Sequence, residues 1–78
     1  MVDRNKLEKV EMALTAIRVE VLRAMNKFPA FNSAHEGYAV LKEEVDEAWD
    51  EIKRNESVMA KEEMIQVGAM AVRFLVDV

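Results

Sequence analysis

Residues that break helices are scarce in this chain, which has two glycines and one proline among 78 residues. So few turn-forming residues leave few places where the chain can reverse direction. Two segments qualify: residues 28–33, which contain Pro29, and residues 54–57. Proline disfavours a helical conformation of the residue before it, so a first helix should end near Phe28. The sequence therefore predicts three long helices.

The two breaks also set the expected helix boundaries. Helices are predicted over roughly residues 3–27, 34–54 and 58–76. Ser33 suits the N-cap of the second helix, and Glu36 three residues later completes a capping box. Ser57 is expected to cap the third helix in the same way. At this length we expect one domain, spanning residues 1–78.

Apolar residues recur every three or four positions in the first two helices and form one stripe on each. The stripes comprise Leu7, Val10, Leu14, Ile17, Val21, Met25 and Phe28, then Leu41, Val45, Ala48 and Ile52. The third helix is apolar nearly all round, and two neighbours cannot cover it. Gly68 in its middle costs about 1 kcal/mol relative to alanine unless it permits a close helix crossing. We expect an all-α, three-helix protomer that forms a dimeric or tetrameric helix bundle.

Composition excludes several classes of protein. The absence of cysteine rules out a disulfide scaffold and thiolate metal sites, and a single histidine rules out multi-histidine metal centres. A net charge of −4 argues against a nucleic-acid polymer as partner. Charged residues interrupt every apolar stretch, so neither a membrane span nor an export signal is predicted. A cytoplasmic protein with no membrane partner is expected.

The acidic residues are concentrated in the middle of the chain. Residues 36–63 contain ten acids and four bases, a net charge of −6, whereas residues 1–35 carry +2. Like-charged pairs such as Glu43–Glu47 and Glu47–Glu51 each destabilise a helix by roughly 0.2–0.5 kcal/mol. A solvated helix face is the simpler explanation, and a cation site is the alternative that uncompensated negative charge suggests.

Helical geometry brings four oxygen donors toward one seam. Glu44 and Glu47 lie one turn apart on the same flank of the second helix, beside its apolar stripe. Glu63 and Gln66 have the same spacing on the third helix. If the two helices pack antiparallel, the pairs face each other and offer three carboxylates and an amide oxygen. Such hard oxygen ligands suit Mg²⁺ or Mn²⁺, and Mg²⁺ typically binds substrate phosphates.

At these positions the chain resembles the MazG-like proteins of the all-α NTP pyrophosphatase superfamily. The string EEVDE at residues 43–47 fits the family motif EExxE, and EMIQ at residues 63–66 takes the place of the second motif, ExxD. Fifteen residues separate them, which suits the family. The strings FNSAHEGY at 31–38 and IQVGAMAVRF at 65–74 are similar to short MazG-like proteins as well. The resemblance covers most of the chain from Phe28 onward.

The resemblance implies an enzyme that hydrolyses a nucleoside triphosphate between its α and β phosphates with Mg²⁺ as cofactor. It assigns Glu44, Glu47 and Glu63 to the metal, and gives Glu43 a supporting or water-orienting role in catalysis. Gln66 stands where the family usually has Asp, and its amide can ligate a metal but adds no charge. The alternative is therefore a non-catalytic MazG-like helical oligomer or binding protein with an impaired metal site. The Glu-x-x-His pairs of di-metal oxygen-chemistry bundles are absent.

Further residues are candidates for binding the substrate: Arg73, Lys53, Lys61, His35 and Trp49. A charge within the apolar third helix needs a partner or a ligand, so Arg73 either binds phosphate or pairs with an acid of a neighbouring subunit. Lys53 and Lys61 flank the second turn. His35 is either a surface residue or a hydrogen-bond partner of a base. Trp49, like Tyr38, either packs in the core or stacks on a nucleobase.

Overall fold

The computed structural model describes residues 1–78 and consists of three α-helices. They are α1 (Arg4–Lys27), α2 (Ala34–Lys53) and α3 (Ser57–Asp77). The all-α prediction is confirmed, and each observed boundary lies within one residue of its expected position. None of the helices combines the length and the apolar character that crossing a bilayer requires.

Side chains cap the first two helices. Asp3 accepts a hydrogen bond from the backbone N–H of Lys6 at 2.8 Å at the start of α1. Ser33 caps α2 as predicted, because its hydroxyl oxygen accepts from the backbone N–H of Glu36 at 3.1 Å. The Glu36 carboxylate reaches one residue further back than in an ordinary capping box and accepts from the backbone N–H of Asn32, also at 3.1 Å. These bonds hold the loop between α1 and α2 against the start of α2.

The turn between α2 and α3 differs from the prediction. Ser57 is not a cap but the first residue of α3, and Glu56 occupies the cap position without a side-chain bond. The turn is formed instead by the end of α2, where Asn55 adopts a positive φ of 59°. The backbone N–H of Asn55 donates to the carbonyl oxygen of Ile52, and that of Glu56 donates to the carbonyl oxygen of Glu51, each at 3.0 Å. These two bonds form a Schellman motif. Helix α3 begins directly after this motif. Ser57 is therefore already helical and cannot act as the N-cap.

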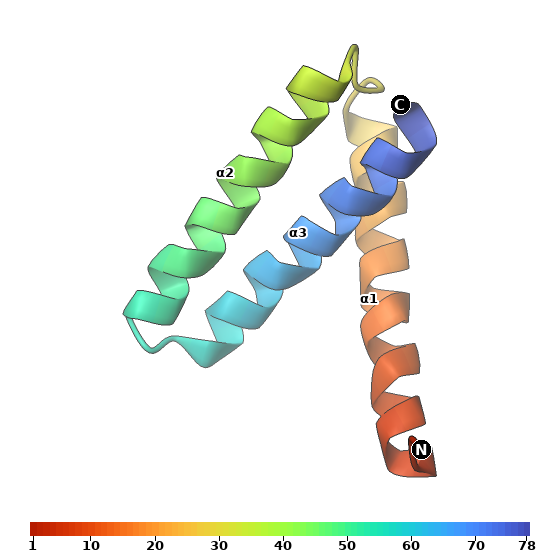
Figure 1. Cartoon of the computed structure of the whole chain (residues 1–78), viewed down its shortest axis with the longest axis vertical. Helices are drawn as coiled ribbons and strands as arrows, with labels where there is room; N and C mark the ends of the chain where they lie inside the picture. Colours follow the sequence, from red (N-terminus) through yellow and green to blue (C-terminus); the bar gives the residue numbers. More distant parts are fainter.

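Helix α3 lies between the other two helices (Figure 1). It forms an antiparallel hairpin with α2 and crosses α1, whereas the backbones of α1 and α2 do not approach each other. The buried core lies where α1, the first loop and α3 meet, and it consists of Val21, Ala24, Phe31, Ala69 and Met70. Because α1 and α2 diverge on either side of α3, a space remains between them with α3 as its floor.

Both glycines stand where side chains from elsewhere in the chain come close. A Cβ atom at Gly68 would lie 2.8 Å from Cδ1 of Ile17, so this glycine lies at the crossing of α1 and α3, as the sequence suggested. A Cβ atom at Gly37 would lie 2.7 Å from the ring of Phe74 and 3.1 Å from the ring of Phe31. Ile17 meets Gly68 with the end of a flexible side chain, whereas two rigid rings surround Gly37.

The apolar stripes are only partly buried within one chain. The first half of α1 extends beyond its neighbours (Figure 1), and Leu7, Val10 and Leu14 are 47–52% exposed. Trp49 and Tyr38 are also more than half exposed, so neither is a core residue of the single chain. In the second half of the α1 stripe, Val21 is buried and Ile17 and Met25 are partly buried, whereas the first half and Phe28 stay exposed.

The two glycines provide a matched test of this packing. Alanine at either position gains helix propensity worth about 1 kcal/mol. At Gly37 the clash with two rings should outweigh that gain, so Gly37→Ala is expected to destabilise the protein by about 1–3 kcal/mol. Gly68→Ala should change stability by less than about 1 kcal/mol, since Ile17 can rotate away. Urea denaturation of both variants measures the difference, and equal effects would contradict the packing described here.

Candidate metal centre

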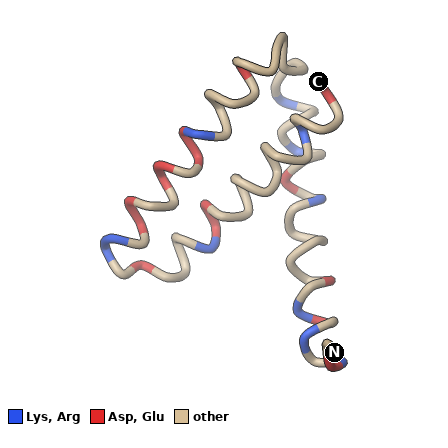
Figure 2. The backbone as a smooth tube through the Cα atoms, in the orientation of Figure 1, with Lys and Arg blue, Asp and Glu red and all other residues tan.

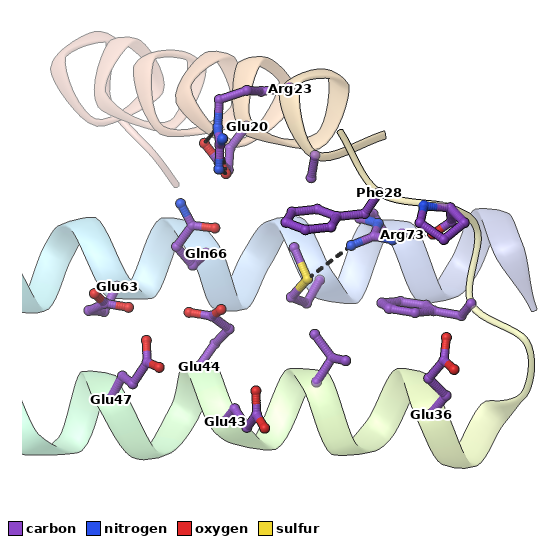
Figure 3. A pocket seen from close by; sticks show the side chains of 15 residues that line it. Glu20, Arg23, Phe28, Glu36, Glu43, Glu44, Glu47, Glu63, Gln66 and Arg73 are labelled. Carbon is purple, nitrogen blue, oxygen red and sulfur yellow. Dashed lines mark hydrogen bonds and ion pairs between the residues drawn. The ribbon is translucent and has the colours of Figure 1, made fainter. Parts of the chain in front are cut away.

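A cavity of about 570 Å³ occupies the space between α1 and α2. Its acidic end is formed by Glu43, Glu44 and Glu47 of α2 together with Glu63 of α3 (Figure 3). The lining also includes guanidinium groups from α1 and α3, aromatic rings of the first loop, Gln66, and the carboxylates of Glu20 and Glu36. The cavity therefore combines a negatively charged end with cationic groups, an arrangement suited to a cation together with an anion.

Three of these carboxylates converge. Oxygen atoms of Glu44, Glu47 and Glu63 all lie within 4.8 Å of one another. The antiparallel hairpin explains this, because the i,i+3 pair on α2 meets the first turns of α3 across the seam. Oxygens that ligate one Mg²⁺ at about 2.0–2.1 Å lie about 3–4 Å apart. Small side-chain rotations would therefore bring the three carboxylates around one cation.

The electrostatics of this group also fit a cation. Burial, followed by the charges of Glu47 and Glu63, raises the pKa of the Glu44 carboxyl to about 7. Burial and Glu47 raise the pKa of Glu63 as well. One oxygen of Glu63, Oε2, is buried and has no hydrogen-bond partner. Crowded carboxylates with an unpartnered buried oxygen are stabilised by a bound divalent cation, and the hard oxygen donors favour Mg²⁺ or Mn²⁺.

Gln66 lies in the same cavity, next to a pair of residues from α1 that the sequence reasoning missed. The Glu20 carboxylate accepts from Nε of Arg23 at 3.0 Å, and both side chains line the cavity. Arg23 is the main cause of a lowered pKa of Glu20, and the Gln66 side chain lowers it further as a donor. In the sequence, Glu20 and Arg23 are visible only as an i,i+3 pair of opposite charges near Ile17. The sequence alone does not show that α1 packs against this part of α3.

Arg73 is buried, with 4% of its surface exposed, and it also lines the cavity. Its Nη2 donates to the carbonyl oxygen of Pro29 at 3.0 Å, and its guanidinium lies 4.3 Å from the ring centre of Phe31. Its Nε has no hydrogen-bond partner, and no carboxylate forms an ion pair with it. Asp77, one turn later, instead accepts from the backbone N–H of Phe31 at 3.1 Å. Arg73 is therefore a buried cation without a compensating anion.

The remaining predicted site residues lie outside this cavity. His35, Lys61 and Trp49 are exposed and do not line it. Lys53 is 3.3 Å from a carboxylate oxygen of Asp50 and 5.7 Å from the ring centre of Trp49. The structure thus gathers Glu43, Glu44, Glu47, Glu63, Gln66 and Arg73, and it leaves the other four residues on the surface of α2 and α3.

Comparison with known proteins adds no identification. No family model, curated protein or solved structure matches the chain.

Acidic residues follow one another along α2 and recur at the start of α3 (Figure 2). A functional conclusion consequently depends on the chemistry of the cavity itself.

The raised pKa of Glu44 predicts a pH effect on the metal-free protein. Because this carboxyl holds its proton more tightly in the folded chain, its contribution to stability is full below its ordinary value of 4.5 and falls as the pH rises to about 7. Glu44→Gln removes this loss. In EDTA, the variant should therefore gain stability over the wild type at pH 8 relative to pH 5, measured by urea denaturation.

Glu62→Gln is the matched control, since Glu62 is exposed, borders the same cluster in sequence and does not line the cavity. It should follow the wild type at both pH values. A Glu44→Gln curve parallel to that of the wild type from pH 5 to pH 8 would show that Glu44 is not crowded as described.

Proposed function

We propose that the chain is a Mg²⁺-dependent nucleoside triphosphate pyrophosphohydrolase, releasing a nucleoside monophosphate and pyrophosphate. The observation that carries the proposal is one cavity that joins three converging carboxylates to a buried, unpaired Arg73. A polyphosphate with a bound metal ion complements this cavity, because the metal ion matches the carboxylates and the phosphate oxygens match Arg73. The choice of a nucleotide and of the α–β bond rests on the resemblance of residues 43–47 and 63–66 to MazG-like proteins.

In this proposal each side chain has a role that its position supports. Glu44, Glu47 and Glu63 hold Mg²⁺ or Mn²⁺, with the Gln66 carbonyl as a further oxygen. When bound, such an ion would neutralise phosphate charge and activate a water for attack. Glu43 reaches the cavity from the residue before Glu44 and orients the attacking water as a hydrogen-bond acceptor (Figure 3).

The cationic groups bind the phosphates. Arg73 offers its unpartnered Nε in a desolvated position, where a charge-assisted bond to phosphate is strongest. Arg23 lines the opposite wall and uses Nε and Nη2 for Glu20, so its Nη1 is available to an anion. Phe28 borders the same cavity and offers an apolar surface for a base.

The second candidate is a MazG-like protein that keeps the fold without catalysis. Gln66 is the observation that favours it, because the amide gives the metal one negative charge fewer than the Asp of the second family motif. Such a protein would bind a nucleotide or a partner weakly and release no pyrophosphate. The two candidates differ in the products that they form from a nucleotide.

We also propose that the protein is a homodimer or homotetramer. A compact monomer of 8.9 kDa exposes about 4,800 Å², whereas this chain exposes 6102 Å². Its radius of gyration of 13.7 Å likewise exceeds the value of about 11.5 Å expected for a compact chain of this length. Leu7, Val10 and Leu14 on the free half of α1 are suitable for burial by a second copy.

The enzymatic proposal is tested by incubating the protein with Mg²⁺ or Mn²⁺ and a panel of ribo- and deoxyribonucleoside triphosphates. Phosphorus NMR should detect a monophosphate and pyrophosphate as products. Glu44→Gln and Glu47→Gln should each lower the rate about 100-fold or more, while Glu62→Gln keeps it. No product from any nucleotide at high protein concentration would favour the non-catalytic alternative, and orthophosphate as product would contradict cleavage at the α–β bond.

The oligomer is tested by light scattering on the eluate of a size-exclusion column. The mass should be two or four times 8.9 kDa. Leu7→Lys together with Val10→Lys should shift it toward the mass of one chain, since two charges would then lie in the buried interface. A wild-type mass of one chain would contradict the proposal.

A further inference from the structure

We propose that Glu20 of α1 is a positioning residue of the metal centre, which orients the Gln66 amide so that its carbonyl oxygen faces the carboxylate cluster. This inference rests on the proposed metal site and adds a third helix to it. The structural basis is the location of Glu20 between Arg23 and Gln66, on the wall of the cavity opposite α2 (Figure 3).

The chemistry of Gln66 makes orientation important. A carboxylate presents two equivalent oxygens, whereas an amide presents one acceptor and one NH₂ donor, and only the acceptor ligates a cation. If the NH₂ group pointed at Glu44 and Glu63, it would bond to them and repel the cation. A fixed acceptor on the other side of Gln66 prevents that orientation by binding the NH₂ group.

Glu20 is placed to be this acceptor. Its side chain is 13% exposed, and the Gln66 side chain acts toward it as a donor. The nitrogen of Gln66 is directed toward Glu20 and α1, and the Glu44 carboxylate lies on the other side of Gln66 (Figure 3). With its NH₂ group directed toward Glu20, Gln66 keeps its carbonyl oxygen for the cavity.

Arg23 holds Glu20 in this position. Its guanidinium donates to both oxygens of Glu20, from Nε at 3.1 and 3.0 Å, and Nη2 donates as well. This fork restricts the carboxylate of Glu20 and balances its charge, so Glu20 adds no net repulsion to the acidic cavity. One feature outside the acidic cluster points to a ligand in this cavity: the buried Arg73, whose Nε has no hydrogen-bond partner. Within the cluster, Oε2 of Glu63 is buried and unpartnered as well.

The test is a double-mutant cycle read by Mn²⁺ binding to the protein alone, followed by the EPR signal of free Mn²⁺. Glu20→Leu should weaken Mn²⁺ binding about tenfold or more, as removal of a partner that orients a metal ligand typically does. In the Gln66→Glu background, the same Glu20→Leu change should weaken binding less than about threefold, because a carboxylate at position 66 ligates in either orientation. A general electrostatic effect of Glu20 would instead give equal losses in both backgrounds and overturn the inference.

Controls separate this inference from the proposed function. Glu11→Gln changes an exposed carboxylate of the same helix and should leave Mn²⁺ binding unchanged. Glu20→Asp keeps the negative charge but shortens the side chain, so the carboxylate lies further from Gln66 and Mn²⁺ binding should also weaken. Thermal melting followed by circular dichroism shows whether each variant is folded. If Glu44→Gln abolishes Mn²⁺ binding while the Glu20 variants bind like the wild type, this inference alone fails. If the wild type binds no Mn²⁺, the proposed metal site fails with it.

Discussion

The contact between α2 and α3 is the constraint on which the rest of the structure depends. It forces Glu44, Glu47 and Glu63 within 4.8 Å of one another, although like charges at this distance repel. Burial, together with this repulsion, raises the pKa of Glu44 and of Glu63. Helix packing therefore maintains an electrostatic strain that a divalent cation would relieve, and in the metal-free chain a retained proton reduces it.

The other two features of the cavity follow from how α1 joins this hairpin. Because α1 crosses α3 at Gly68, with Ile17 against it, its second half reaches the cavity and supplies Glu20 and Arg23. The first loop then passes over the end of α3, where Arg73 holds the Pro29 carbonyl and Asp77 holds the backbone of Phe31. The same crossing leaves the first half of α1 without a neighbour, so the geometry that completes the cavity also exposes the apolar surface proposed for a second copy.

Much of the fold was predictable from the sequence, because its signals are local. Helix ends are defined locally by Pro29, by Ser33 and by the scarcity of glycine. The prediction that Ser57 caps α3 was wrong, because the hydrogen bonds of the Schellman motif after α2 decide where α3 begins. The carboxylate cluster was predictable because helical phase places Glu44, Glu47 and Glu63 along one seam. Glu20 and Arg23 were not, because helical phase does not tell how one helix crosses another. The exposure of Trp49 has the same origin, since burial of a helix flank depends on which neighbour covers it.

A crystal structure of the protein grown with Mn²⁺, with anomalous scattering measured at the manganese edge, would show whether the three carboxylates hold a cation. An anomalous peak is expected within coordination distance of Glu44, Glu47 and Glu63, with the Gln66 carbonyl oxygen directed toward it. A structure with the same helix packing and no peak between these carboxylates, or a peak elsewhere in the cavity, would contradict the proposed metal site.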